Sequence, residues 1–374
     1  MPRRKIAVDA LGIHYPGGGR TATLNTFEGI LELDTQNQFV FFLTQPEASL
    51  KRVNRDDFQV ISPTRNRFLV RIWAQFAIPY HARESALLHF AKNLGVFFTP
   101  CPYIVTVYDL TTLLYPHLFP AFDVWYWRTL ERITLQNAAR VIAISHNTAR
   151  DLKRFYDLPD DKIRVIHPAI GDHFRPVPDH QARAILYKYH LRDDYFIHVG
   201  RIDRKKNLTM LVRAYHRFKL NTSLPTKLVF VGQVYPKSPD SELIPTINAL
   251  GLRDEIIFTG RVPDQDLPAL YSQAQATLFP SIHEGFGLAP IEAMACGSPV
   301  IAHKAGAFAE AAGDAALIID NIDEEKLAEG MTIMRENIKL RKEYAANGLE
   351  RAGLFRKEIT ARKTLDLYRE IIGK

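Results

Sequence analysis

The fold of this chain is decided by the stretch ATLFPSIHEGFGLAPIEAMACGSPVIA at residues 276–302. Its first and last parts, ATLFP and SPVIA, are short apolar runs of the kind that form buried strands. Between them, Pro290 suits the first turn of a helix and Gly297 suits its carboxyl cap, which predicts a helix of about two turns at 289–296. The stretch therefore predicts a strand, a loop, a helix and a second strand, which is the repeating unit of a parallel α/β sheet.

The same alternation of short apolar runs and helical segments extends over almost the whole chain. The first series of runs is KIAVDAL, QFVFFL, ALLHF, YIVTVYDL, RVIAIS and KIRVIHP. The second series, which starts at residue 195, is YFIHVGR, KLVFVG, EIIFTG, ATLFP, SPVIA and ALIID. Helical patterns such as 21–33 and 121–137 lie between the runs. Apolar strands separated by helices predict parallel sheets that are covered on both faces.

A stretch rich in proline, HPAIGDHFRPVPDHQARAI, separates the two series and shows no convincing period. We therefore predict two Rossmann-like α/β domains, at 1–175 and 176–356, and expect the last helix, 357–374, to pack back on the first domain. Ligands of such sheets bind at the carboxyl ends of the strands. We expect the functional site in the cleft where the two domains face one another.

The composition excludes several classes of protein. The 374 residues are 47% hydrophobic, which excludes disordered and fibrous chains. Two cysteines, Cys101 and Cys296, cannot form a disulfide framework, and no apolar run approaches the roughly 18 residues of a membrane span. We therefore expect a cytoplasmic protein. The net charge of +7 fits several anionic partners, and equally a solvated basic surface.

A glycine-rich loop, PGGGRTATLN at 16–25, follows the first predicted strand and leads into a helix. Three glycines let the backbone approach a ligand closely, and the unpaired N–H groups of the helix start that follows can bind phosphate or sugar oxygens. The letters also satisfy a loose GxGxxA pattern for a dinucleotide cofactor, although about six residues separate strand and glycines. A plain turn explains them as well.

A second loop, HVGRIDRKKNL at 198–208, places basic side chains where a predicted strand ends at Gly200. Four basic residues lie from Arg201 to Lys206, where a guanidinium can bind two oxygens of a pyrophosphate and an ammonium supplies a compact charge. The alternative is a solvated basic loop. In EGFGLAPIE, we expect Glu284 in the loop before the predicted helix and Glu292 in the first turn of that helix. Two glutamates make poor phosphate ligands, but carboxylates accept hydrogen bonds well from pairs of hydroxyls, which indicates a sugar.

EGFGLAPIE, GRIDRKKN and EAMACGSPVIA together resemble the donor site of the family 4 retaining glycosyltransferases, which have the GT-B fold of two Rossmann-like domains facing across a cleft. The resemblance extends over most of the chain, including GGGR, VTVYDLTTLLYP, RVIAISHNTARDL and IFTGRVPDQDLPALYSQA, and is greatest to mannosyltransferase-like members. It implies an acceptor-side first domain and a second domain that binds the nucleotide-sugar donor.

The resemblance also implies a role for each matching residue. Arg201 and Lys206, next to Gly200, would bind the donor pyrophosphate and stabilise the leaving nucleoside diphosphate, and Gly18 and Gly19 would cover the phosphates. The remaining implied contacts are Glu284 with the backbone of Phe286, Gly287 and Leu288 for the donor sugar, Glu292 for the ribose, and Arg261 with Val262 for the base. The family commonly has histidine where this chain has Tyr108, whereas the following Asp109 matches.

The function expected from these residues is transfer of a hexose from a nucleotide sugar, with GDP-mannose favoured, to a saccharide or lipid-linked saccharide. No DxD-like pair occupies a plausible metal position, so we expect neither a metal nor another cofactor. The stretch at 65–79 mixes arginines with apolar residues at helical spacing, which fits a core helix or an interfacial helix that contacts anionic lipid at the inner membrane face. The rival functions are an NAD-dependent oxidoreductase and a nucleic-acid or anionic-surface binder, but nucleic acid has no recognition motif or aromatic stripe in its favour.

Overall fold

The computed structural model describes residues 3–14, 17–47, 57–62, 64, 66–93, 95–235, 239–304 and 306–373. The chain divides into two compact units, of which the first comprises 1–170 with 356–374 and the second comprises 171–355. Each unit contains one sheet in which every neighbouring pair of strands is parallel. The predicted limits, 175 and 356, compare with observed limits at 170 and 355.

The sheet of the first unit has seven strands in the order β3-β2-β1-β4-β5-β6-β7. Its strands are β1 (Lys5–Asp9), β2 (Gln38–Leu43), β3 (Asp57–Val60), β4 (Leu87–Phe90), β5 (Tyr103–Val107), β6 (Arg140–Ala143) and β7 (Ile163–Val165). Six of them coincide with the predicted apolar runs. Strand β3 was not predicted, because DFQV is a short edge strand with too few apolar residues to show a pattern.

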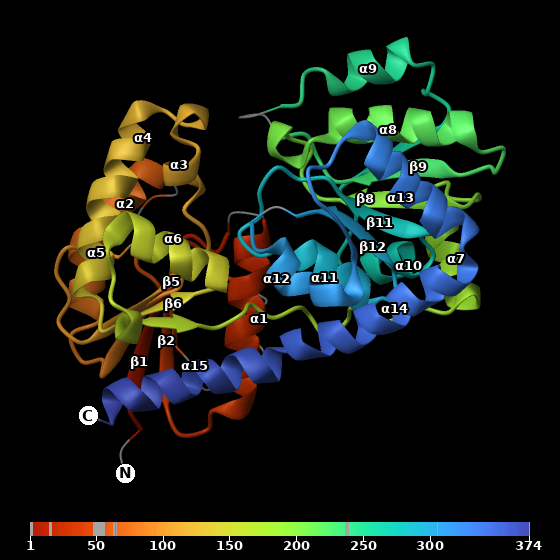
Figure 1. Cartoon of the computed structure of the whole chain (residues 1–374). Helices are drawn as coiled ribbons and strands as arrows, with labels where there is room; N and C mark the ends of the chain where they lie inside the picture. The colour runs from red at the N-terminus through yellow and green to blue at the C-terminus, as the bar shows by residue number, and fades with distance from the viewer. Residues whose placement is uncertain are drawn as a thin grey trace. The chain divides into compact units, whose positions relative to one another are not determined.

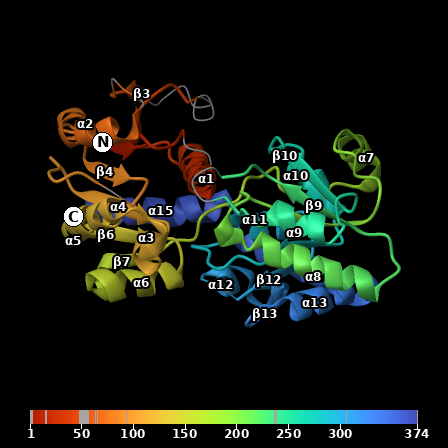
Figure 2. The same cartoon turned by 90° about the horizontal axis from the view of Figure 1, so that it is seen from above.

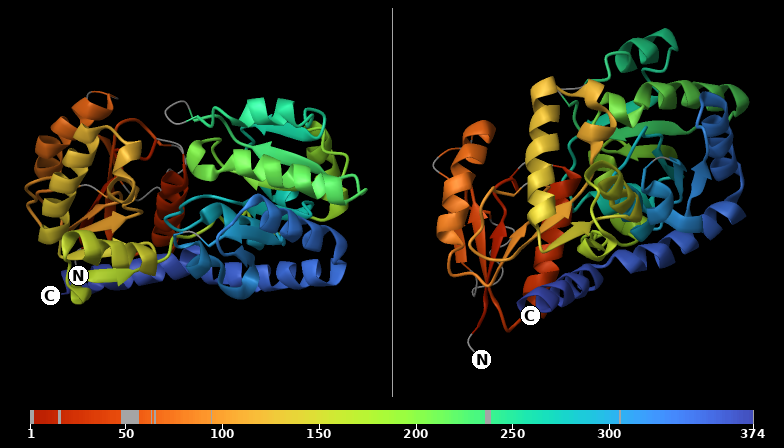
Figure 3. Two further views of the ribbon diagram at one scale, coloured as in Figure 1. Left: turned by 45° about the horizontal axis from the view of Figure 1, so that its top comes forward. Right: turned by 60° about the vertical axis from the view of Figure 1, so that its left-hand side comes forward.

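Helices cover both faces of this sheet. One face packs against α1 (Gly18–Leu33) and α15 (Lys357–Ile372), which lie side by side in Figures 1 and 3. A Cβ at Gly29 of α1 would lie 2.8 Å from the carbonyl oxygen of Lys357, so glycine allows the two helices to approach. The opposite face packs against α2 (Arg67–His81), α3 (Thr111–Leu114), α5 (Arg132–Asn137) and α6 (His146–Tyr156).

The sheet of the second unit has six strands in the order β10-β9-β8-β11-β12-β13. Its strands are β8 (Tyr195–Val199), β9 (Lys227–Val231), β10 (Ile256–Gly260), β11 (Ala276–Phe279), β12 (Val300–His303) and β13 (Leu317–Ile319), all of them predicted. Its helices are α7 (Asp179–Lys188), α8 (Leu208–Asn221), α9 (Leu243–Ala249), α10 (Leu267–Ser272), α11 (Leu288–Ala295), α12 (Phe308–Ala312), α13 (Glu324–Glu336) and α14 (Ile338–Ala352). Figure 2 shows α8 running beside α9 and α13 on this unit.

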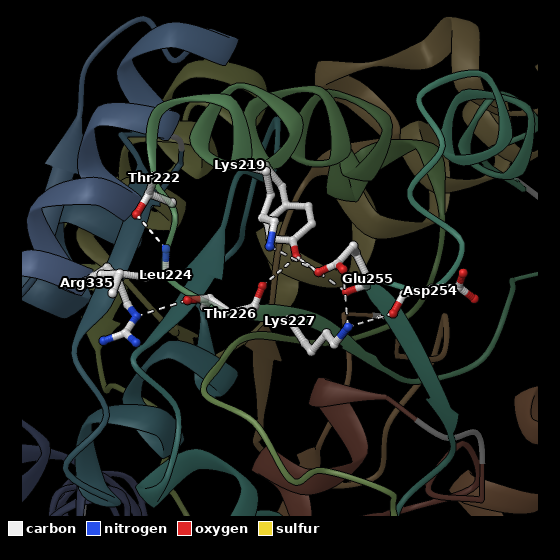
Figure 4. A network of polar contacts seen from close by, with 9 residues as sticks. Lys219, Thr222, Leu224, Thr226, Lys227, Asp254, Glu255 and Arg335 are labelled. Atoms are coloured by element: carbon white, nitrogen blue, oxygen red, sulfur yellow. Dashed lines mark hydrogen bonds and ion pairs between the residues drawn. The ribbon is translucent and has the colours of Figure 1, made fainter.

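A polar network joins the amino-terminal ends of two strands to α8 (Figure 4). The Glu255 carboxylate, just before β10, lies 3.2 Å from the ammonium of Lys219 and 3.3 Å from that of Lys227. Burial alone would raise the pKa of Glu255, but these two ammonium groups lower it. The phenol of Tyr215 donates a 2.6 Å hydrogen bond to the Thr226 carbonyl. The network lies at the edge opposite the carboxyl ends of the strands, so we assign it to stability.

Three helical expectations differ from the structure in detail. The predicted helix at 289–296 is α11, which begins one residue earlier, so Glu292 lies in its second turn and not in its first. The segment 121–137 is α4 (Ala121–Tyr126) and α5 joined by a π-helical turn, Trp127–Glu131. The stretch 65–79 corresponds to α2, although Arg65 lies outside the described residues, as does Pro16 of the glycine-rich loop.

Candidate active site

The basic loop of the second unit follows β8, as predicted. Asp203 is buried and caps a single 3-10 turn at 204–206, where its carboxylate accepts a 3.2 Å hydrogen bond from the backbone N–H of Lys206. Asn207 then adopts a left-handed conformation (φ 56°) and starts α8. These two residues turn the chain sharply, which brings Arg201 and Lys206 to the carboxyl edge of the sheet.

Arg201 and Lys206 have different surroundings within this loop. The guanidinium of Arg201 is half exposed and lies 4.4 Å from the centre of the Tyr235 ring and 3.6 Å from the Asp203 carboxylate. It can therefore reach an anion in solvent while keeping its orientation. The Lys206 ammonium is largely buried and donates a 2.5 Å hydrogen bond to the Glu284 carboxylate. The structure thus brings together two residues that are 78 positions apart in the sequence.

Glu284 is ionised because of its cationic neighbours. Burial alone would raise the pKa of Glu284, but the Lys206 and Lys205 ammonium groups lower it to about 2. A permanent carboxylate beside a fixed ammonium can accept hydrogen bonds from hydroxyls while the ammonium faces an anionic group. This arrangement suits a ligand that carries both hydroxyls and phosphates.

Two glycines give the Glu284 loop its shape. Gly306 has φ +63°, and a Cβ at this position would lie 2.1 Å from the carbonyl oxygen of Glu284, so only glycine fits. The same carbonyl accepts a 3.0 Å hydrogen bond from Ala307 N–H. Gly287, with φ +94°, precedes α11, whose first residue is Leu288. The backbone N–H groups that start α11 therefore lie at the carboxyl edge of the sheet, next to Glu284 in the chain.

Glu292 on α11 has the opposite electrostatic character. Its carboxyl group is buried, and among the described residues no cation pairs with it. Burial raises the pKa of Glu292 to about 8, and the nearby Asp264 carboxylate adds to the increase. A buried carboxyl group without a cationic partner is available for ligand hydroxyls.

The remaining predicted donor-domain residues divide into exposed and buried positions. Arg261 is exposed directly after β10, whereas Val262 is buried. The side chain of Phe286 is buried against Phe355, with ring centres 5.3 Å apart, so only its backbone can contact a ligand. Gly200 lies at the carboxyl end of β8, between Val199 and Arg201.

The predicted residues of the first unit lie at the start of α1 and the end of β5. Gly18 and Gly19 form the first turn of α1, which contains no acidic residue. A Cβ at Gly19 would meet no atom within 4 Å, so the space above this turn is open. Tyr108 and Asp109 follow β5, and the Asp109 carboxylate accepts a 2.9 Å hydrogen bond from the N–H of Thr111, the first residue of α3. Burial raises the pKa of Tyr108 to about 12, while the hydrogen bond with Thr23 acts in the opposite direction.

The sequence did not indicate His198, which is buried at the end of β8, just before the basic loop of the second unit. Its Nδ1 pairs with the Leu278 carbonyl at 2.8 Å, whereas its buried Nε2 has no partner among the described residues. Burial lowers the pKa of His198 to about 4, so the imidazole is neutral. The apolar run YFIHV predicts only a buried strand. The partner of the imidazole, the Leu278 carbonyl, belongs to β11 and cannot be read from this run.

Among the described residues of either unit taken alone, no three His, Cys, Asp or Glu side chains have their ligand atoms close enough together to hold a metal ion. The described part of the chain also contains no helix that could cross a membrane.

Comparison with known proteins gives the family. Residues 17–173 match the family described as Glycosyltransferase Family 4, and residues 188–351 match Glycosyl transferases group 1. The chain is 25% identical over 314 residues to O-antigen chain mannosyltransferase B of Escherichia coli, which is 83% of this chain and 79% of that protein. It is 26% identical over 347 residues to the serotype-specific mannosyltransferase WbdA of Escherichia coli, or 91% of this chain, and spans only 42% of that protein.

Solved structures show the same fold. Anabaena Alr3699/HepE, crystallised with UDP-glucose, superposes with a TM-score of 0.80 at 18% identity over 98% of this chain and 99% of its own. Sucrose-phosphate synthase from Thermosynechococcus elongatus superposes with a TM-score of 0.78 at 22% identity over 99% of this chain and 100% of its own. The two α/β domains of the present chain, each with one parallel sheet, therefore have the GT-B fold. The chain belongs to the family 4 glycosyltransferases and is a hexosyltransferase related to mannosyltransferases.

Proposed function

We propose that this enzyme transfers a hexose, with retention of the anomeric configuration and without a metal ion, from a nucleotide sugar to a saccharide or lipid-linked saccharide. The observation that carries the proposal is the 2.5 Å pair of Lys206 and Glu284 at the carboxyl edge of the second sheet. One side chain suits a phosphate and the other suits sugar hydroxyls. Because the chain is a glycosyltransferase, we explain the glycine-rich loop as part of a nucleotide-sugar site and not as the cofactor site of an NAD-dependent oxidoreductase.

The proposed chemistry follows from the charges of the site. When the bond between the anomeric carbon and the donor phosphate breaks, negative charge grows on the leaving diphosphate. Arg201 and Lys206 are preorganised cations that stabilise this charge, and the loss of one such donor lowers turnover by about 10²- to 10³-fold in comparable sites. Glu284 and the N–H groups of Phe286, Gly287 and Leu288 orient the sugar.

The other ends of the donor have matching groups. The buried carboxyl group of Glu292 accepts hydrogen bonds from the ribose hydroxyls, and Arg261 with Val262 flanks the base. The N–H groups of Gly18 and Gly19 bind the phosphates. We propose GDP-mannose as the donor because mannosyltransferases are among the relatives.

A donor panel tests this function. We expect GDP-mannose to raise the melting temperature more than UDP or ADP sugars do, since a ligand at 100 times its Kd stabilises a protein by about 2.7 kcal/mol. EDTA should not reduce turnover. A chain that responds to no nucleotide sugar, or one that loses activity with EDTA, would contradict the proposal.

We also propose that α2 contacts an anionic membrane at the face where a lipid-linked acceptor is presented. Large apolar side chains on this helix are exposed, namely Leu69, Ile72, Trp73, Phe76 and Tyr80. Phe97 and Phe98 extend the patch, because Phe97 N–H donates a 3.0 Å hydrogen bond to Gln75 of α2. Arg71 lies 4.9 Å from the centre of the Tyr126 ring and supplies positive charge. This combination of aromatic and basic side chains is typical of interfacial helices.

Vesicle sedimentation tests this contact. We expect the protein to bind vesicles that contain phosphatidylglycerol, and the variant Phe76→Asp to bind them at least tenfold more weakly. Leu220→Asp is the matched control, because Leu220 is equally exposed (72% against 71%) in the second unit. Equal binding by both variants would exclude α2 as the contact.

A further inference from the structure

We propose that Tyr108 is a positioning residue that holds the glycine-rich turn at the start of α1, and that its phenol takes no part in proton transfer. This inference rests on the proposed role of Gly18 and Gly19 in binding the donor phosphates. It concerns a position at which this chain has tyrosine where its family commonly has histidine. The evidence is a chain of hydrogen bonds within the first unit.

The hydrogen bonds have only one consistent direction. The Thr23 hydroxyl donates its single hydrogen to the Gly19 carbonyl at 2.8 Å. The Tyr108 phenol lies 2.8 Å from the same Thr23 oxygen, and since Thr23 has no second hydrogen, the phenol must be the donor. The hydrogen of Tyr108 is therefore used inside the unit, and through Thr23 it fixes the carbonyl of Gly19.

The phenol also lies among side chains of the first unit. Tyr108 and Thr23 line a small pocket of this unit together with Phe27, His89 and Thr106. A phenol with a pKa near 12 holds its proton at neutral pH, so it cannot act as a base there. Its hydroxyl therefore serves to hold Thr23 and not to accept a proton.

A second layer of hydrogen bonds holds the backbone of Tyr108. Its N–H donates a 3.0 Å hydrogen bond to the amide oxygen of Asn93. The Asn93 amide donates to the Asp109 carbonyl at 2.8 Å and to the buried Glu131 carboxyl group at 2.9 Å. The Tyr156 phenol donates to the other oxygen of Glu131 at 2.6 Å. Several hydrogen bonds thus hold the end of β5, and Tyr108 connects it through Thr23 to a turn whose glycines have wide backbone freedom.

The loss of this connection has two measurable effects. Without the phenol hydroxyl, the turn at 17–20 samples more conformations, and donor binding must restrict them again. In Tyr108→Phe and Thr23→Val we expect the KM for the nucleotide sugar to rise about 3- to 10-fold, the range of one hydrogen bond, while kcat changes less than threefold. Because the two residues act in series, the double variant should resemble either single one.

The experiment compares donor KM, kcat and amide hydrogen exchange at 17–24 in these variants. Exchange at 17–24 should be faster in both single variants, and Thr23→Ser, which keeps the hydroxyl, should restore wild-type exchange and KM. A kcat loss of 100-fold or more in Tyr108→Phe, with wild-type exchange and a normal Thr23→Val enzyme, would overturn the inference and place the phenol on the substrate. If the wild-type chain transfers no sugar, the proposed function fails, and the exchange data alone decide whether Tyr108 fixes the turn.

Discussion

Replacement of Lys206 by methionine should destabilise the second unit in a way that depends on pH. Methionine keeps the apolar stem and removes the ammonium that donates to Glu284 at 2.5 Å. The Glu284 carboxylate, with 19% of its side chain exposed, is then left without its hydrogen-bonded cation. Breaking a buried ion pair on one side is strongly destabilising, because the remaining charge stays desolvated.

The magnitude follows from the pKa of Glu284. A decrease from 4.5 to about 2 corresponds to about 3 kcal/mol of stability at neutral pH. Because the folded-state pKa is lowered, this contribution is present above pH 4.5 and is lost as the pH falls from 4.5 towards 2. We therefore expect Lys206→Met to cost about 3 kcal/mol at pH 7 and progressively less at lower pH. Lys205→Met is the control, since Lys205 acts on Glu284 only through its charge, and it should cost about 1 kcal/mol or less.

Urea unfolding at several pH values from 7 down to about 2.5 measures this difference, because the contribution is lost between pH 4.5 and 2. The three tryptophans, Trp73, Trp125 and Trp127, all lie in the first unit, so their fluorescence reports that unit, whereas far-UV circular dichroism reports both. The loss should occur in the transition seen by circular dichroism. A Lys206→Met protein as stable as the wild type at pH 7, or a difference that does not shrink with falling pH, would refute the reasoning.

Three further predictions concern other parts of the site and the fold. Ligand hydroxyls favour the carboxylate form of Glu292, whose pKa is about 8 in the free protein, so donor affinity should rise from pH 6.5 to 8.5 and then level off. Calorimetric titration should show this rise in the wild type but not in Glu292→Gln. A flat wild-type profile would argue against a Glu292 contact. Gly232→Ala should abolish the soluble protein, because Gly232 has φ +145° and a Cβ there would lie 1.8 Å from the Gly200 carbonyl oxygen. Gly251 has positive φ but open space around it, so Gly251→Ala should cost only about 1 kcal/mol by thermal unfolding. Similar losses of stability in the two variants would contradict the steric argument. Glu255→Gln removes the ion pairs with Lys219 and Lys227 and should cost about 1 kcal/mol at pH 7. Because the folded-state pKa of Glu255 is lowered, the difference in stability between variant and wild type should vanish as the pH falls below 4.5. A difference in urea unfolding that stays constant with pH would count against this assignment.

The sequence predicted the sheets well because their information is local. Buried parallel strands are continuous apolar runs, and those that form β1 and β8 can be recognised without knowing their neighbours. The edge strand β3 has only the letters DFQV, so its place depends on pairing with β2 and not on its own composition. The division of the chain was visible from the restart of the pattern.

The site was predictable only where its residues share one loop. Arg201 and Lys206 lie in a single motif, and so do Glu284 and Glu292. The pairs that define the electrostatics join distant segments: Lys206 with Glu284 across 78 positions, and Tyr108 with Thr23 across 85. A sequence pattern does not record which side chains meet in space, so these contacts required the structure.

Hydrogen exchange of the wild-type protein with and without a nucleotide sugar tests the central claim most directly. The claim is that the loops 198–208 and 284–292 form the donor site of a glycosyltransferase. With saturating GDP-mannose, or the UDP or ADP sugar that stabilises the protein most, we predict slower exchange in both loops. A nucleotide sugar that binds without changing exchange in either loop would contradict the account.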